Sequence, residues 1–292
     1  MTAHGEPVIV DPERQLGWEK RHRPRAAIAA LLGAIGLLVV NITEPILQKD
    51  APRASGLETL QRAVEPGNVG KLPSLQAPFF EYLDSKSALV LAIGIGGFIG
   101  WLGVAWAVGF LGVATRSRVP MFRRWIVYVP IIGGVLVAVG ALLLQVGRLQ
   151  VTHDFLAGDR TVQSVKDANG SVIAFAQLVG QLGTLASAIG IVLVSLNAMR
   201  AGLMTRMLGY LGIASGAMLV LIALPLIQIF WLGGLALVLI GRWPGGDLLA
   251  WRTGQAEPWP TAERPPPRQR REVAAPAASP SPAPRRKRKK RH

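Results

Sequence analysis

Few side chains in this sequence could do chemistry, and the first candidates are two glutamines and a threonine. Gln177, Gln181 and Thr184 lie within one apolar run, at a spacing that places them along one face of a helix. Such a face could line a path for a small polar solute. It could equally form hydrogen bonds to neighbouring helices, each worth about 0.6–2 kcal/mol. Two amides and a hydroxyl are usual in such helix contacts, so the pattern favours packing over a solute path.

A second candidate is a run of seven basic residues near the end of the chain: Arg285, Arg286, Lys287, Arg288, Lys289, Lys290 and Arg291. Cations this close together attract anionic phospholipid headgroups, by about 1 kcal/mol for each charge near the surface. They could instead bind nucleic acid without sequence preference, or serve only for topology and solubility. No aromatic residue follows Trp259, so stacking on bases has no support and nucleic acid is the partner that we favour least.

Known catalytic and metal-binding motifs are missing from the sequence. It has no Cys, no H-E-x-x-H, no G-x-S-x-G and no G-x-x-x-x-G-K-[ST]. We therefore expect no catalytic residue, no cofactor and no metal ion. An enzyme acting on lipid would have only Glu44, Glu81, Asp84, His153 and Asp154 to use, and we rank that function last.

The composition points to a membrane. Half of the 292 residues are hydrophobic and 17% are charged, against about 25% charged in a soluble domain. The apolar residues form uncharged blocks of membrane-span length. This pattern excludes a soluble enzyme with one core and a disulfide-stapled secreted domain.

We predict an all-α polytopic transmembrane bundle of six spans, at about 26–42, 88–114, 125–146, 172–197, 208–224 and 226–241. The first span could belong to a signal peptide, but no cleavage pattern follows it, so we expect it to be retained. The last two spans come from one uncharged stretch, 207–241, which as a single helix would be about 50 Å long against a core of about 30 Å. Pro225 in its middle favours two spans, with one kinked span as the alternative.

Charge sets the expected orientation. With six spans, 24 of the 32 Lys and Arg residues fall on one side, whereas five spans would place the 13 basic residues after Gly241 on the other. The positive-inside rule therefore favours six spans with both termini cytoplasmic. The expected parts are a cytoplasmic segment 1–25, a bundle 26–243 with outer loops 48–86 and 148–171, and a tail 244–292 that is disordered from about residue 261.

Small residues predict a compact bundle. Gly96-x-x-x-Gly100 and Gly212-x-x-x-Gly216 allow close helix approach, within the chain or against a membrane protein partner or a second copy. We expect Trp231 to pack inside the bundle. We expect four further tryptophans to lie at the headgroup level as interfacial anchors: Trp125, Trp243, Trp251 and Trp259.

The stretch N-A-M-R-A-G-L-M-T-R-M-L-G-Y-L-G-I at 197–213 forms a short turn between two spans. It resembles a group of multi-pass bacterial membrane proteins of unknown function, and the similarity covers about residues 170–260. The resemblance implies a fold and a location but no activity. Arg outnumbers Lys 24 to 8, which also suggests a bacterium with a GC-rich genome.

These features together favour a non-enzymatic protein of the bacterial inner (plasma) membrane, an accessory or scaffold component with an electrostatic lipid-binding tail. Its partners would be the bilayer and anionic phospholipid headgroups. The alternative is a small-solute channel or transporter lined by Gln177, Gln181 and Thr184.

Overall fold

The computed structural model describes residues 12–53, 72–168, 171–221, 225–244 and 246–259, and isolated positions between 53 and 72. Within them the chain is helical and forms no named strand. The helices are α1 (Pro12–Lys49), α3 (Ala77–Ser85), α4 (Ser87–Arg118), α5 (Arg124–Ala157), α6 (Val162–Ala168), α7 (Ser171–Arg200), α8 (Arg206–Leu221), α9 (Pro225–Ile240) and α10 (Leu249–Thr253).

Four helices are long and apolar enough to cross a membrane: α1, α4, α5 and α7. Each contains one of the predicted spans. Residues 207–241 contain two helices, α8 to Leu221 and α9 from Pro225, as the predicted division requires, whereas their role as a fifth and a sixth span stays a prediction. Proline suits the first position of a helix because its missing N–H would have no partner there. With 16 residues each, α8 and α9 are about 24 Å long, less than the bilayer core of about 30 Å.

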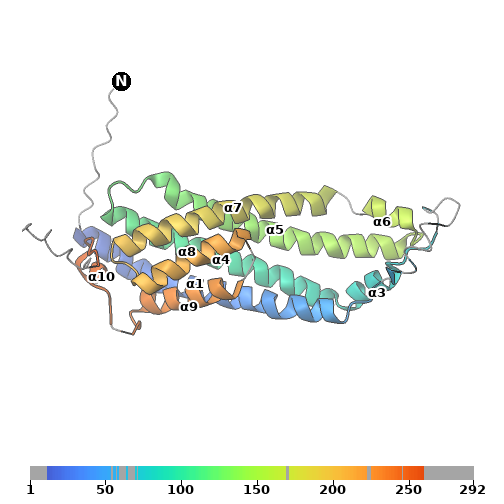
Figure 1. The fold of residues 1–292 in the computed structure, drawn as a ribbon, viewed down its shortest axis with the longest axis horizontal. Helices are drawn as coiled ribbons and strands as arrows, with labels where there is room; N and C mark the ends of the chain where they lie inside the picture. Colours follow the sequence, from blue (N-terminus) through green and yellow to red (C-terminus); the bar gives the residue numbers. More distant parts are fainter. Residues whose placement is uncertain are drawn as a thin grey trace, which may run out of the picture. The chain divides into compact units, whose positions relative to one another are not determined.

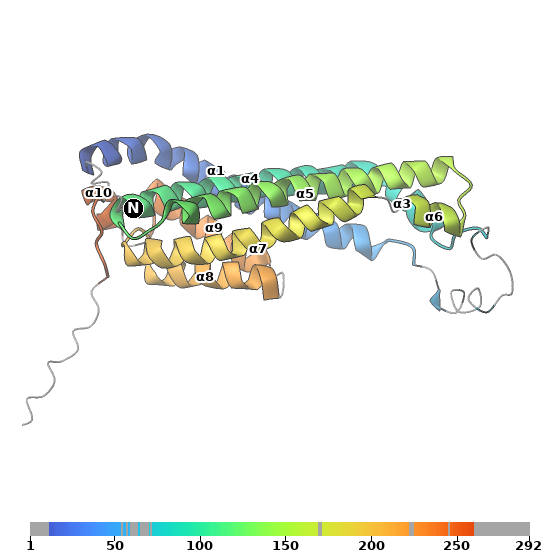
Figure 2. The same ribbon diagram turned by 90° about the horizontal axis from the view of Figure 1, so that it is seen from above.

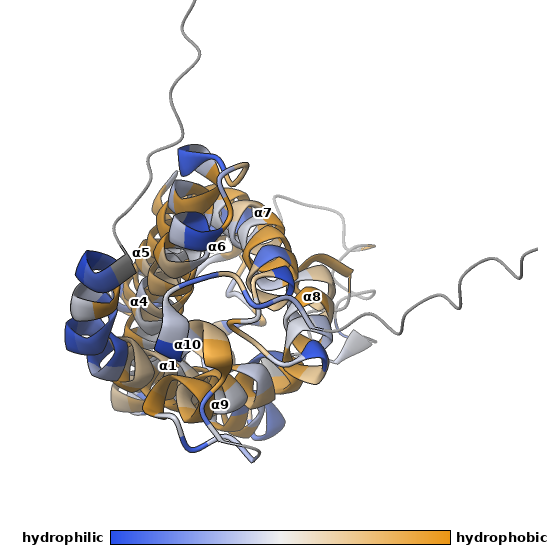
Figure 3. Cartoon of the chain, turned by 90° about the vertical axis from the view of Figure 1, so that its left-hand side faces the viewer, coloured by the Kyte–Doolittle hydropathy of each residue, from blue (hydrophilic) through white to orange (hydrophobic). Residues whose placement is uncertain are grey.

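The six apolar helices form a closed ring in the order α1, α4, α5, α7, α8, α9, with α9 returning to α1 (Figure 3). Neighbours in the chain run antiparallel. Gly33 of α1 lies beside Val104 of α4, and Gly133 of α5 lies beside Ser187 of α7. The starts of α1, α5 and α8 therefore lie at the same end of the ring as the ends of α4, α7 and α9.

Close helix approach depends on the glycines, as predicted. A Cβ on Gly36 would lie 2.5 Å from the Gly96 carbonyl oxygen and 2.6 Å from the Gly100 Cα, so α1 and α4 touch at their backbones. Gly216 approaches the Ala188 carbonyl in the same way. Trp231 is fully buried in the main core cluster, which confirms its predicted packing role.

The α8–α9 hairpin covers only one half of the long helices (Figures 1 and 2). Along α9, Val238 lies beside Arg23 and Leu232 beside Gly33 of α1. Along α8, Gly209 lies beside Met199 of α7 and Gly216 beside Val192. Extending both registers, the end of α8 at Leu221 and the start of α9 at Pro225 lie well short of the last turns of α1 and the first turns of α7. Within the described residues, neither α8 nor α9 extends between those turns.

Two helices extend beyond the predicted spans. α1 begins at Pro12, so the basic cluster at 20–25 is helical rather than part of a separate segment. α5 continues to Ala157, well into the expected outer loop 148–171. Each extension lies outside an apolar run but still packs an aromatic side chain. In α1, Trp18 packs on the main core, and in α5, Phe155 is buried against Phe80.

Candidate functional site

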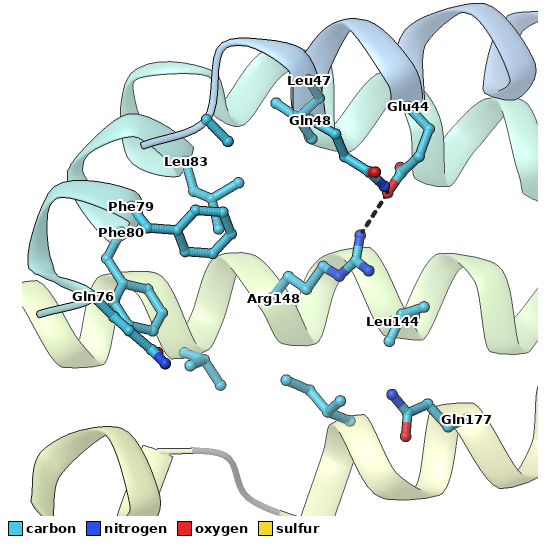
Figure 4. Close-up of a pocket in the computed structure, with 13 residues that line it drawn as sticks. Glu44, Leu47, Gln48, Gln76, Phe79, Phe80, Leu83, Leu144, Arg148 and Gln177 are labelled. Carbon is cyan, nitrogen blue, oxygen red and sulfur yellow. Dashed lines mark hydrogen bonds and ion pairs between the residues drawn. The ribbon is translucent and has the colours of Figure 1, made fainter. Parts of the chain in front are cut away.

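A pocket of about 410 Å³ lies in the half of the bundle that the hairpin does not reach. Figure 4 shows α1 and α7 on opposite sides of it, with α5 between them and α3 closing one end. Its walls are apolar, including Leu83, Leu144 and Ile173, whereas Glu44 and Arg148 bring charges into it.

The short helix α3 is held over the pocket by its own amphipathic pattern. Phe80 and Leu83, three residues apart, are its buried residues. The Phe80 ring packs on Phe155 of α5 with ring centres 4.4 Å apart. The Tyr82 hydroxyl donates a hydrogen bond to the Leu47 carbonyl oxygen of α1 at 3.2 Å. α3 therefore links α1 to α5 at this end.

Glu44 and Arg148 form the polar centre of the pocket. Arg148 Nη1 lies 3.5 Å from Glu44 Oε1 and donates to Gln145 Oε1 at 3.2 Å. Gln48 Nε2 also donates to Glu44 Oε1, at 3.0 Å. The Arg148 side chain is 37% exposed and that of Glu44 is 27% exposed, so the ion pair is open to solvent or ligand. An exposed pair of this kind contributes only about 0–1 kcal/mol to stability.

The three polar residues singled out in α7 do not share one environment. Gln177 is exposed and lines the pocket opposite Arg148 (Figure 4). Gln181 is exposed, one turn further along and outside the pocket lining. Thr184 is half-buried and donates to the Gly180 carbonyl oxygen of its own helix at 2.8 Å. The solute path stays a prediction; of its three residues, Gln177 lines the pocket.

The chain matches no family model, no curated protein and no solved structure. The resemblance over residues 170–260 therefore stays an expectation.

The opposite end of the bundle holds a buried ion pair. Arg118 Nη2 donates to Glu19 Oε2 at 2.8 Å, and Arg118 Nη1 donates to Glu19 Oε1. The exposed fractions of the two side chains are 0% for Arg118 and 3% for Glu19. Arg118 Nη2 also donates to the Ala250 carbonyl oxygen at 2.7 Å, and its Nη1 to that of Ala114 at 2.9 Å. The pair thus joins α1, α4 and α10.

Trp251 of α10 covers this ion pair, and its prediction as an interfacial anchor is wrong because it is buried, with 5% exposed. Its Nε1 donates to the Leu203 carbonyl oxygen at 3.0 Å. The guanidinium carbon of Arg118 lies 5.4 Å from the ring centre and that of Arg23 4.8 Å. Two cation–π contacts and one hydrogen bond therefore give the indole better partners than the headgroup region offers.

The segment around α10 is fixed at further points. Arg23 Nη2 pairs with Asp247 Oδ1 at 2.5 Å. The Glu257 amide donates to the Ala201 carbonyl oxygen at 3.1 Å. Gly202 has φ of +76°, and a Cβ there would lie 2.1 Å from the Glu257 carbonyl oxygen, so only glycine fits. Residues 247–257 are thus packed on the end of the bundle where α1 begins.

A third polar group lies inside the ring. Ser195, Ser215, Gln228 and Trp231 are almost fully buried, and their side-chain N and O atoms have no hydrogen-bond partner within the described residues. They come from α7, α8 and α9. They lie where the hairpin packs on α7, since Gly212 faces both Ser195 and Trp231.

The sequence did not predict the Glu19–Arg118 and Glu44–Arg148 ion pairs. Arg118 lies in a cluster of arginines that topology alone explains. One sequence signal indicated that Arg118 turns inward: it follows Leu111 and Ala114 on one helix face. The structure shows that face to be buried, since Leu111 and Ala114 are fully buried. Nothing local pairs Glu44 with Arg148, which are 104 residues apart. The basic run Arg285–Arg291 and the expected disordered tail lie outside the described residues.

Proposed function

We propose that this chain is a non-enzymatic integral membrane protein, an accessory or scaffold component that attaches to anionic lipid through its basic C-terminal run. The observation that supports this most is the packing of residues 247–257 on the bundle. Trp251 and Glu257 hold the start of the C-terminal part of the chain at a fixed end of the helices. Because the chain continues toward Arg285 from this end, we expect the basic run to meet the membrane face at the same end.

The distribution of charge supports an orientation in which the end of the bundle where α1 begins faces the cytoplasm. At the end where α1 begins, cations greatly outnumber acids among the described residues; they include Lys20, Arg21, Arg25, Arg116, Arg123, Arg124, Arg200, Arg206, Arg242 and Arg252. At the other end, Arg148 and Arg160 are balanced by Glu44 and Glu81. By the positive-inside rule the first end faces the cytoplasm.

On this proposal α8 and α9 are the fifth and sixth spans, short enough to require local thinning of the bilayer at one side. Both termini are then cytoplasmic, in the inner membrane of a bacterium. The chain has no cysteine, so single-cysteine variants report accessibility without background. In intact cells, a membrane-impermeant maleimide should label Asp154→Cys and not Arg252→Cys. Labelling of both, or of Arg252→Cys alone, would contradict the orientation.

The tail is tested on purified protein in detergent with added vesicles. We expect the chain to bind vesicles that contain an anionic phospholipid, and replacement of the seven basic residues at 285–291 by Gln to remove most of that binding. About 1 kcal/mol is expected from each charge near the surface. The matched control deletes residues 273–284, which contain no charge, and should bind as the full chain does. Equal binding by the Gln variant would exclude the tail as the attachment site.

A further inference from the structure

The pocket between α1 and α7 lies beyond the described ends of α8 and α9, at Leu221 and Pro225, and neither helix contributes to its lining. Two helices that are long and apolar enough to cross a membrane, α1 and α7, contribute to its lining. Beyond the end of α8, α7 exposes Leu178, Leu182 and Leu185. An apolar chain leaving the pocket sideways would lie along this surface, in the position that lipid tails occupy.

The charges of the pocket lie at the depth of lipid headgroups. Glu44 follows the apolar run at 26–42, and Arg148 follows the apolar run at 125–146. Charged side chains at the ends of apolar runs lie at the membrane interface. The pocket therefore combines a polar centre at headgroup depth with apolar walls.

Arg148 has donors available for a phosphate. Within the described residues its hydrogen bonds all start from Nη1, which leaves Nη2 and Nε for a second acceptor. These two groups match two phosphate oxygens in the bidentate geometry that guanidinium groups favour. The Gln177 amide faces the same space from α7, with no hydrogen bond to any described residue (Figure 4).

Glu44 supplies the opposite charge a short distance away. Its carboxylate is 27% exposed and lies 3.5 Å from Arg148. A bare anion placed on Arg148 would therefore be repelled by Glu44. A headgroup with an anion and a cation a few atoms apart would instead meet a complementary charge at both positions.

We propose that this pocket binds a zwitterionic phospholipid with a primary ammonium group, of the phosphatidylethanolamine type. Arg148 and Gln177 hold the phosphate, and Glu44 accepts hydrogen bonds from the ammonium. Leu83, Leu144 and Ile173 contact the glycerol and the first methylenes. This binding site is separate from the C-terminal run and does not depend on it.

The test uses the full chain, purified and stripped of lipid in detergent, with short-chain phosphatidylethanolamine, phosphatidylcholine and phosphatidylglycerol added separately. Bound lipid is counted by native mass spectrometry. Phosphatidylethanolamine should bind best. The trimethylammonium of phosphatidylcholine cannot donate a hydrogen bond to Glu44, and the uncharged glycerol of phosphatidylglycerol leaves the negative charge of Glu44 uncompensated. Equal binding of all three, or a preference for phosphatidylglycerol, would overturn the proposal.

Variants assign the roles of the side chains. Arg148→Gln should weaken phosphatidylethanolamine binding by about tenfold or more, the effect of losing a charge-assisted hydrogen bond. Glu44→Gln should keep lipid binding and lose the preference for the ammonium headgroup. Gln177→Ala changes an exposed residue, so it should fold normally and weaken binding of all three lipids.

The matched control is Arg160→Gln, because Arg160 pairs with Glu81 at 3.1 Å at the same end but lines no part of the pocket. It should bind phosphatidylethanolamine as the unmodified chain does. Size-exclusion profiles show whether each variant is folded. If Gln177→Ala and Glu44→Gln are folded and bind all three lipids as the unmodified chain does, the proposed site is wrong, whatever the behaviour of Arg148→Gln.

Discussion

The guanidinium of Arg118 binds both carboxylate oxygens of Glu19, across 99 residues of sequence, in a site from which solvent is excluded. Each member of the pair also needs the other. A buried charge without its partner costs far more than the intact pair contributes, about 3–5 kcal/mol when one partner is removed. This relationship makes the end of the bundle near α10 dependent on two side chains.

Arg118→Gln should therefore lower the free energy of unfolding by about 3–5 kcal/mol, because the Glu19 carboxylate would stay buried without a cation. Unfolding of the purified protein by titration with a denaturing detergent measures the change. Arg124→Gln is the control, since Arg124 is exposed at the same cationic end and should change stability by less than about 0.5 kcal/mol. If the two variants unfold alike, the ion pair has no structural role.

Trp251→Ala should release residues 247–257 from the bundle. The indole loses its hydrogen bond to Leu203, its contacts with two guanidinium groups and its buried area, about 3–5 kcal/mol together for a buried aromatic residue. Limited digestion with trypsin, followed by mass spectrometry, should show faster cleavage after Arg252. Leu249→Ala, at an exposed position of the same helix, should leave the rate unchanged. Equal rates in both variants would mean that Trp251 does not hold the segment.

Gly36→Ala should destabilise the bundle, because the new methyl group would meet the backbone of α4 at Gly96 and Gly100 and force the helices apart. Overpacking of this kind costs about 1–3 kcal/mol. Gly180→Ala makes the same change in α7 at a position with nothing within 4 Å, so it should stabilise by about 1 kcal/mol through helix propensity. Detergent-induced unfolding of both variants, compared side by side, tests the opposite signs.

The helices could be predicted from the sequence because their cause is local. An uncharged run must bury its backbone hydrogen bonds in a helix when no water is near, and Pro225 lies at the start of α9, where proline fits. Helix–helix approach was predictable for the same reason, since Gly96 and Gly100 repeat at the spacing of a helix face.

The sites could not be predicted because their causes are long-range. Which arginine of the cluster at 116–124 turns inward depends on where Glu19 lies, and α1 was not expected to begin early enough to bring Glu19 there. The burial of Trp251 depends in the same way on Arg23 and Leu203. The pocket depends on a length difference between helices that pack together, which no single segment contains.

The short hairpin also has a consequence for the surrounding bilayer. Six helices share the cross-section of the ring near the start of α1, whereas, of these six and within the described residues, α1, α4, α5 and α7 alone continue to the pocket end. In a membrane, the protein then takes more area from one leaflet than from the other. A membrane accommodates this difference when the leaflet at the six-helix end is on its convex side. The chain should therefore favour curved membrane over flat membrane.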